Sequence, residues 1–202
     1  NIGVLVPSTG SSANLGQLME KGARLAEEQL NAGGGIDGKQ VHVVVEDSKG
    51  QPKDGVAAFN KLVTVDRTPA VTIAFSSVIE ACLPAAQASK VTLVNCPANS
   101  PKLRDRPYLW NVNILSDQEG TALARFARES LKATTAAVLY VNNDSGQGFR
   151  KMFGDEFEKR GGRVVLSEGH AQGSKDFRAT LAHVGAAKPD LVFIASYYLE
   201  SA

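Results

Sequence analysis

The sequence predicts an α/β protein built on parallel β-sheets, and two observations lead to this prediction. Short, largely apolar runs recur along the chain, and most are followed by a stretch with apolar residues at helical spacing. The runs are nearly continuous rather than alternating, which is typical of parallel strands covered on both faces. Strands and helices that alternate in this way favour parallel sheets joined by right-handed crossovers.

The apolar runs are the expected strands. Those expected to be buried are residues 2–6, 41–45, 71–75, 91–94, 136–141, 164–166 and 191–195. A further short strand is expected at 108–112. Prolines at positions 69 and 189 precede two of the runs and end whatever element comes before them.

Amphipathic segments between these runs are the expected helices. The first helix carries an apolar stripe, expected to face the core, that consists of Leu15, Leu18, Met19, Gly22, Ala23, Leu25, Ala26 and Leu30. Similar stripes at 123–131 and 149–157 indicate two more helices. Pro52 lies near the start of another, which is expected to run to about Val65. The glycine-rich stretch 31–38 ends the first helix.

Residues 95–117 interrupt this alternation with three prolines and a charged cluster, and the regular pattern resumes from about Glu119. We therefore expect two α/β lobes, residues 1–116 and 117–202, with a crossing between them near 113–118. The chain begins inside an expected strand without an initiator methionine and ends just after another strand. This pattern predicts a processed or trimmed chain with an incomplete second lobe.

Composition excludes several classes of protein. Hydrophobic residues make up 43% of the 202 residues, enough for a substantial core. The 22 basic and 21 acidic residues give a net charge of +1, which argues against a nucleic-acid partner. No apolar run approaches the roughly 20 residues of a membrane helix. The two cysteines are too few for a disulfide scaffold or a four-cysteine zinc site, so a soluble globular protein is expected.

Ligands of open α/β sheets bind beyond the carboxyl ends of the strands, and four loops are candidates. The loop 7–16 is rich in small residues but lacks the phosphate-loop and dinucleotide fingerprints, and it is a ligand loop or merely a helix entry whose serines cap. The serines at 76–77 open a helix and suit a carboxylate, or else simply cap that helix. In the loop 96–100, Asn99 is a candidate ligand contact or an ordinary turn residue. The glycines of 142–148 allow a close backbone approach or merely a turn.

A catalytic or metal-binding constellation cannot be assembled from the sequence. His42 is expected in a strand, His170 in a polar loop and His183 on a helix, and none has metal-ligand spacing with another His or Cys. No nucleophile elbow surrounds Ser76. The acidic pair at 46–47 is interpreted as a solvated strand end. We therefore expect neither enzyme activity nor a cofactor.

The two cysteines lie fourteen positions apart, Cys82 on an expected helix and Cys96 at a strand end. Cysteine packs as a small hydrophobic residue, so buried free thiols are the default expectation. A disulfide between the two is the alternative in an oxidising compartment.

Short motifs in order along the whole chain carry a family resemblance. They are residues 2–10, 31–39, 46–52, 76–77, 95–101, 117–120, 175–177 and 188–193. Together they resemble the type I periplasmic solute-binding proteins, specifically the leucine/isoleucine/valine-binding family of ABC importers. Members of that family are considerably longer, so the resemblance also implies an N-terminal fragment.

The resemblance implies two α/β lobes that are joined by a hinge and close over a ligand. It assigns the ligand carboxylate to Ser76 and Ser77, and further first-lobe contacts to Pro97 and Asn99. Second-lobe contacts fall on position 145 and on Tyr197, although a tyrosine there is also compatible with an ordinary strand-end aromatic. The acidic partner of a ligand ammonium would lie beyond the last residue.

Three of the positions implied to contact the ligand depart from the family pattern, and the first-lobe disulfide partners of some members are absent at Gly50 and Phe75. Leu15 lies where an aromatic residue often precedes the glycine of the first loop, Ser145 replaces another aromatic, and Asn99 stands where threonine is common. A pocket with fewer aromatic side chains admits a bulkier or more polar ligand. Leucine itself is therefore not the expected ligand.

The function implied is that of the extracytoplasmic solute-binding component of an ABC importer. It would bind a small amino acid, or a related carboxylate or amide, in the cleft between the lobes and would change no chemical bond. The implied partner is a membrane ABC permease, and no nucleic-acid partner is expected. The implied location is the periplasm after removal of a signal peptide, or the outer surface of a Gram-positive cell with a lipid anchor. The alternative is a ligand-sensing domain of a receptor or regulator.

Overall fold

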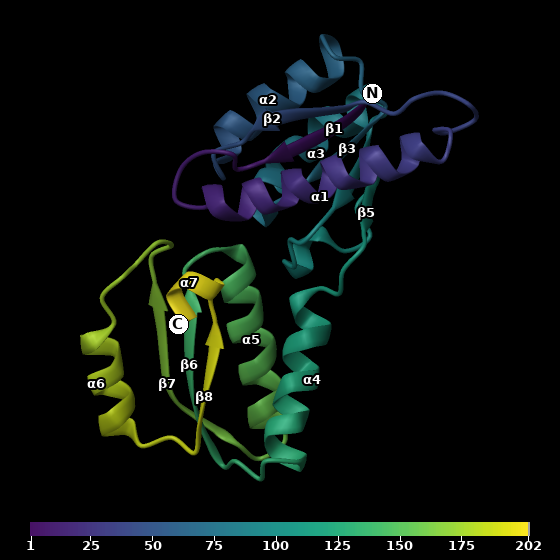
Figure 1. Ribbon diagram of the computed structural model, residues 1–202. Coiled ribbons are helices and arrows are strands. Elements are labelled where there is room, and N and C mark those ends of the chain that lie inside the picture. The colour runs from purple at the N-terminus through teal and green to yellow at the C-terminus, as the bar shows by residue number, and fades with distance from the viewer. Residues whose placement is uncertain (202) are drawn as a thin grey trace. The chain divides into compact units, whose positions relative to one another are not determined.

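The computed structural model describes residues 1–201, apart from the side chains of residues 198 and 199. Within that range it contains eight β-strands and seven α-helices (Figure 1). The chain divides into two compact units. Unit 1 comprises Asn1–Ala98 and Leu103–Asn113, and unit 2 comprises Asn99–Lys102 and the chain from Ile114 onward.

Unit 1 contains a five-stranded sheet in the order β2-β1-β3-β4-β5, and every pairing in it is parallel, as predicted. Its strands are β1 (Ile2–Val6), β2 (Val43–Asp47), β3 (Ala70–Ile73), β4 (Thr92–Asn95) and β5 (Leu109–Asn111). Its helices are α1 (Ala13–Ala32), α2 (Pro52–Thr64) and α3 (Ser76–Ser89). The largest fully buried side chains of this unit, Phe59, Leu5, Leu62, Ile73, Ile79, Leu83, Leu93 and Leu103, form its core.

Unit 2 contains a three-stranded parallel sheet in the order β7-β6-β8. Its strands are β6 (Thr135–Val141), β7 (Arg163–His170) and β8 (Leu191–Ala195). Its helices are α4 (Ser116–Glu129), α5 (Asp144–Lys159), α6 (Arg178–Ala187) and α7 (Tyr198–Ser201). The turn Pro101–Leu103 is a short 3-10 helix at the boundary between the units. No helix in the described part of the chain is long and apolar enough to cross a membrane.

Aromatic stacking forms the core of unit 2. Phe153 of α5 stacks on Phe193 of β8 with 4.3 Å between ring centroids, and on Phe157 with 5.4 Å. Helices α4 and α5 approach closely at Gly120, where a Cβ would lie only 3.1 Å from the Cβ of Met152. These contacts anchor α5, and so hold the N-terminus of α5 at the end of β6.

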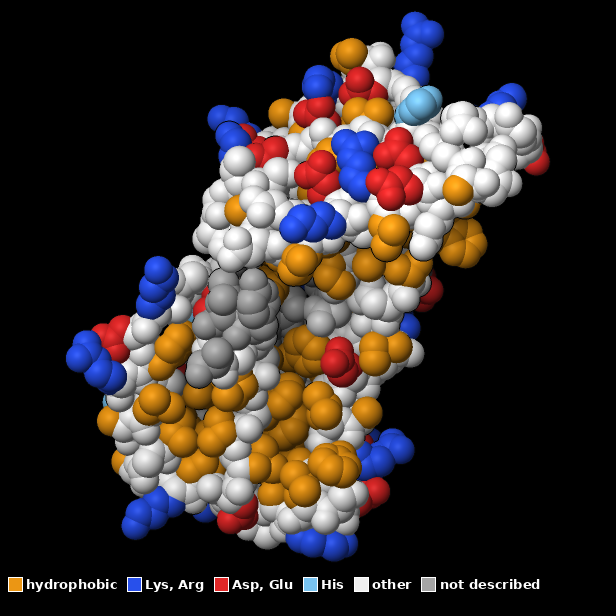
Figure 2. All heavy atoms as spheres, viewed as in Figure 1, with side chains coloured by type: hydrophobic (Ala, Val, Ile, Leu, Met, Phe, Trp, Pro, Cys, Tyr) orange, Lys and Arg blue, Asp and Glu red, His pale blue; other side chains and the backbone are white. Residues whose placement is uncertain are grey.

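Among the residues that the structure describes, strand β8 is covered on only one face. Its side chains alternate, so that Phe193 packs against the aromatic core while Val192 and Ile194 are 41% and 45% exposed. Figure 2 shows hydrophobic side chains gathered on the visible face of this unit. The expectation that helices cover the strands on both faces is therefore wrong for β8, because β8 lies at the edge of its sheet and α6 packs against β7 instead.

Two further expectations are corrected. Strand β7 pairs with β6 as far as Val141↔His170, so His170 ends a strand and does not lie in a loop. The apolar stripe of α1 is not a core face, since Leu18, Leu25 and Leu30 are all at least 44% exposed. The reason is that other side chains of α1 face the sheet.

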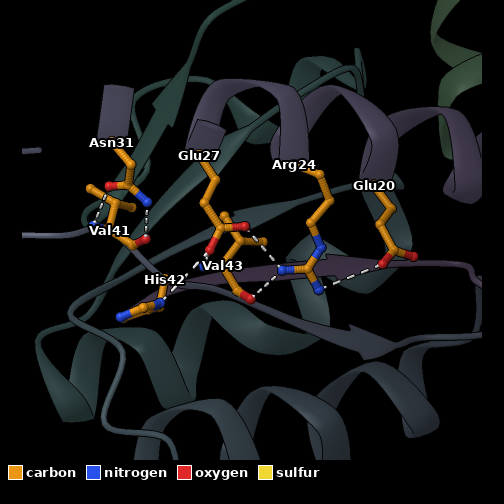
Figure 3. A network of polar contacts seen from close by, with 7 residues as sticks. All are labelled: Glu20, Arg24, Glu27, Asn31, Val41, His42 and Val43. Carbon is orange, nitrogen blue, oxygen red and sulfur yellow. Dashed lines mark hydrogen bonds and ion pairs between the residues drawn. The ribbon is translucent and has the colours of Figure 1, made fainter. Parts of the chain in front are cut away.

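Three polar side chains of α1 bind the backbone at the start of β2 and just before it (Figure 3). Asn31 accepts from the Val41 N–H at 2.7 Å and donates to the Val41 carbonyl at 2.8 Å. Glu27 accepts from the Val43 N–H at 2.9 Å, and Arg24 donates to the Val43 carbonyl at 2.7 Å. The Val43 N–H and the Arg24 guanidinium lower the pKa of Glu27. Edge strands with unpaired backbone groups are templates for aggregation, and these contacts occupy the backbone groups of Val41 and Val43.

Asn31→Ala is expected to lower the free energy of unfolding by about 1–3 kcal/mol, because two hydrogen bonds to the edge backbone are lost at about 0.5–1.5 kcal/mol each. Urea denaturation measures the loss, and hydrogen exchange should show faster exchange of the Val41 amide. Gln29→Ala, an exposed change on the same helix, is the control. Equal exchange rates at Val41 in the variant and the wild type would show that Asn31 does not protect this edge.

Asp190 joins β6 to β8 at their amino ends. Its Oδ2 accepts from the hydroxyl and the N–H of Thr134, both at 2.7 Å, and from the Thr135 N–H at 2.9 Å. These hydrogen bonds, led by the Thr134 hydroxyl, hold the pKa of Asp190 well below its usual value. A carboxyl group with a lowered pKa stabilises the fold above its unfolded-state pKa, and the contribution disappears as the pH falls below that value.

The free energy of unfolding is therefore expected to fall as the pH is lowered from about 5 towards 2. Asp190→Asn should make this fall smaller. Urea denaturation at a series of pH values measures the slope. Glu158→Gln, which also removes a carboxyl group but at an exposed position of α5, is the control. If the free energy of unfolding fell as steeply with pH in Asp190→Asn as in the wild type, the fall would be due to other carboxyl groups.

The cysteines differ in environment, and both are free thiols. Cys82 is buried in α3, and burial raises the pKa of its thiol to about 12. Cys96 is exposed, so the expectation of two buried thiols is wrong for Cys96, which lies in the loop just after β4.

Candidate functional site

The serine pair lies at the start of α3, directly after β3, the central strand of the unit 1 sheet. Ser76 and Ser77 are the first two helical residues, and the N-cap is Phe75, so the alternative that a serine caps this helix is wrong. Phe75 has φ 68° and ψ 121°, a conformation that is rare for an aromatic residue and that redirects the chain from strand to helix. The first-turn N–H groups of a helix have no intrahelical acceptor. With the adjacent hydroxyls, they suit an anionic group.

Asp47 organises the loop between β1 and α1. Its Oδ1 accepts from the N–H groups of Ser8 at 2.9 Å and Lys49 at 2.8 Å, and its Oδ2 accepts from the Thr9 hydroxyl. Partial burial opposes ionisation, but these hydrogen bonds outweigh it and keep the pKa of Asp47 below its usual value. The interpretation of this acidic strand end as merely solvated is therefore wrong. Leu15 lies half-buried in the first turn of the helix that this loop enters.

The loop after β4 is held by Asn95, whose side chain accepts from the Ala98 N–H at 2.9 Å and donates to the Ala98 carbonyl at 2.6 Å. Pro97 is exposed in this loop, and the bond that precedes it is a cis peptide. This turn places Pro97 just beyond the carboxyl end of its strand, where the resemblance puts a ligand contact.

Asn99 belongs to unit 2 by its contacts. Its carbonyl accepts from the Ser116 N–H at 2.6 Å, and its side-chain oxygen accepts from the Ser145 hydroxyl. Lys102, nearby in the sequence, pairs with Asp144 at 2.6 Å. The resemblance puts Asn99 on the same lobe as the serine pair, whereas these contacts connect it to the N-termini of α4 and α5.

The N-terminus of α5 brings the other two predicted positions close together. Asn143 is the N-cap, and its Oδ1 accepts from the Gly146 N–H at 3.0 Å. Its Nδ2 donates to the Tyr197 hydroxyl at 3.1 Å, and Ser145 lies in the first turn. Burial raises the pKa of Tyr197 although the Asn143 hydrogen bond opposes this. Sequence reasoning placed Asn143 in the candidate loop 142–148 but missed its individual role, for which the signal was the preference for asparagine before a helix.

A cavity of about 570 Å³ lies in unit 2 among residues of β6, β7, α6 and 194–201. His170 lines it, hydrogen-bonded to Ser196 at 2.6 Å and edge-on to Phe177 at 5.0 Å. None of the predicted site residues lines this cavity. Among the described residues, no group of three or more His, Cys, Asp or Glu could hold a metal ion.

Parallel α/β sheets with polar helix N-termini beyond their strands are the features of an α/β ligand-binding protein. The chain belongs to the periplasmic binding protein family, whose model matches residues 1–198. This match confirms the family resemblance seen in the sequence.

Two relatives come from Pseudomonas aeruginosa. An amino acid binding protein is 30% identical over 205 residues, which cover 99% of this chain and 54% of the relative. A leucine-, isoleucine-, valine-, threonine- and alanine-binding protein is 29% identical over 196 residues, with 96% and 52% covered. The chain thus spans about half the length of the curated relatives it matches.

Solved structures confirm the predicted fold class. The branched-chain amino acid transporter substrate-binding protein LivJ from Streptococcus pneumoniae, solved with isoleucine, has a TM-score of 0.88 and 28% identity, covering 98% of this chain and 57% of LivJ. A solute-binding protein of an ABC transporter from Rhodopseudomonas palustris has a TM-score of 0.90 at 22% identity, covering 98% and 55%, which shows the shared fold.

Proposed function

We propose that the protein is the solute-binding component of an ABC importer and that it binds a small carboxylate. The observation that carries the proposal is the pair Ser76 and Ser77 in the first turn of α3, at the carboxyl end of the central strand. Membership of the periplasmic binding protein family supports it. So do relatives at 28–30% identity whose names specify amino acids.

The chemistry of this helix start favours a carboxylate. The first-turn N–H groups and the positive end of the helix dipole stabilise a negative charge by about 0.3–1 kcal/mol at an exposed site and up to about 2 kcal/mol at a partly buried one. Ser76 is only 7% exposed, so its surroundings are largely dry. Hydrogen bonds to an ionised group are also stronger than neutral ones. The ligand is held and released without a change in any covalent bond.

The resemblance supplies the rest of the proposed ligand contacts. Pro97, Asn99, Ser145 and Tyr197 are proposed to contact the same ligand, and Leu15 to line the first loop beside it. Amide and hydroxyl groups at these positions favour an amino acid or a related carboxylate or amide. The departures from the family pattern favour a ligand other than leucine.

A thermal-shift panel on the complete encoded protein tests the proposal. The panel contains amino acids, keto acids, aromatic carboxylates and short amides, each in large excess over the protein. A ligand at 100 times its dissociation constant adds about 2.7 kcal/mol of stability, which raises the melting temperature. A shift confined to one class of carboxylate is expected, and no shift with any member would overturn the assignment.

We further propose an extracytoplasmic location and a membrane permease as partner. The test reconstitutes a permease encoded beside this protein into liposomes and measures ATP hydrolysis with and without the ligand-loaded protein. Stimulation by the loaded protein is expected for an importer component. A protein that binds its ligand without stimulating any such permease would instead fit the ligand-sensing alternative.

A further inference from the structure

Asn143 makes two hydrogen bonds that together fix which way its side-chain amide points. A backbone N–H needs an acceptor, so the oxygen Oδ1 must face Gly146, from which it accepts at 3.0 Å. The amide nitrogen is thereby turned to the other side. There it donates to the Tyr197 hydroxyl oxygen at 3.1 Å, across 54 positions of sequence.

We propose that Asn143 is a positioning residue that orients the Tyr197 hydroxyl for ligand binding. This inference rests on the proposed function, in which Tyr197 contacts the ligand. The hydroxyl oxygen of Tyr197 accepts from the Asn143 N–H, so the hydroxyl hydrogen points away from Asn143. Tyr197 therefore meets a ligand as a hydrogen-bond donor, which favours a ligand oxygen over an ammonium group.

The surroundings of Tyr197 agree with a neutral donor. Burial raises the pKa of Tyr197, and the charge of Glu200 acts in the same direction. Glu200 is close because its carboxylate accepts from the Tyr197 N–H at 3.1 Å. The hydroxyl therefore keeps its hydrogen at physiological pH.

Variants that keep the cap of α5 distinguish the positioning of Tyr197 from a merely structural role of Asn143 as that cap. Asn143→Ser and Asn143→Asp both retain a side-chain oxygen that can accept from the Gly146 N–H, and both remove the N–H donor to Tyr197. Unchanged melting temperatures would show that the cap is intact. Asn142→Ser, at the neighbouring exposed position, is the matched control.

The first readout needs no ligand. In protein labelled with ¹³C at tyrosine Cζ, NMR titration follows each of the four tyrosines, and Tyr197→Phe assigns the signal of interest. Asn143→Ser is expected to raise the pKa of Tyr197, because a hydrogen bond that favours the phenolate is lost. An unchanged Tyr197 titration in Asn143→Ser would overturn the inference.

The second readout uses the amino acids and aromatic carboxylates of the panel. Asn143→Ser should weaken binding about tenfold in the wild-type background and less than about twofold in Tyr197→Phe, since the two residues act as one unit. Equal losses in both backgrounds would overturn the inference. If no carboxylate binds the wild type, the proposed function fails, while the tyrosine titration still decides whether Asn143 positions Tyr197.

Discussion

Gly146→Ala is expected to lower the free energy of unfolding by about 1–3 kcal/mol, the range for forcing an extra carbon into a packed site. A Cβ at this position would lie 2.0 Å from the Val141 carbonyl oxygen, which belongs to the backbone of β6. Relief therefore requires the start of α5 to move away from the strand. Urea denaturation followed by circular dichroism measures the loss.

Gly185→Ala is the matched control for this substitution. Gly185 also lies within a helix of unit 2, and a Cβ there would meet nothing within 4 Å. Alanine is a better helix former than glycine, so this variant should gain about 0.5–1 kcal/mol. If Gly146→Ala were as stable as Gly185→Ala, the close approach of α5 to β6 would be contradicted, and with it the placement of Asn143 and Ser145.

Phe153→Ala is expected to cost about 3–5 kcal/mol, the usual loss for removing a buried aromatic ring from a core. Phe153 is 1% exposed and stacks on both Phe157 and Phe193. The substitution removes the ring that connects α5 to β8 and leaves a cavity between them. Urea denaturation measures the free energy, and near-ultraviolet circular dichroism reports the loss of fixed aromatic packing.

Phe126→Ala is the control, because it removes a phenylalanine side chain that is exposed and not buried in the core. Phe126 lies on α4 in the same unit but is 53% exposed, so its replacement should change the free energy of unfolding by about 0.5 kcal/mol or less. Similar losses in the two variants would contradict the assignment of Phe153 to the centre of the core.

Apolar periodicity predicted where elements lie better than where they end. The runs 2–6 and 191–195 coincide with β1 and β8. Strand β3 stops at Ile73, before the end of its apolar run, because Phe75 adopts a positive φ and starts the turn into α3. Strand β7 continues well past its apolar run to His170, since pairing with β6 extends through polar residues that carry no apolar signal.

The leucines of α1 show a second limit. A stripe at helical spacing indicates an amphipathic face, but not which face meets the sheet. Arg24, Glu27 and Asn31 face the edge strand because they satisfy its backbone, and this leaves Leu18 and Leu25 exposed. No local pattern distinguishes these polar residues from an ordinary solvated face.

Candidate site residues at strand ends could be predicted because parallel strands place their loops at one edge of a sheet. The serines at the start of α3 were found in this way. Asp47 and Asn143 lie in segments that the sequence also singled out, but their roles were not predicted. Those roles depend on partners 39 and 54 positions away in sequence, Ser8 and Tyr197. Contacts at such separations leave no periodic signal in a single sequence.

The most direct test of solute binding is an equilibrium titration of the complete encoded protein with the carboxylate that gives the largest thermal shift. The wild type is expected to saturate at a single site. Ser76→Ala should bind about 10–100-fold more weakly, since a hydrogen bond to a charged group contributes about 1.5–3 kcal/mol. Ser89→Ala, at the other end of α3, should bind like the wild type. Equal affinities in Ser76→Ala and the wild type would contradict a carboxylate site at the start of α3.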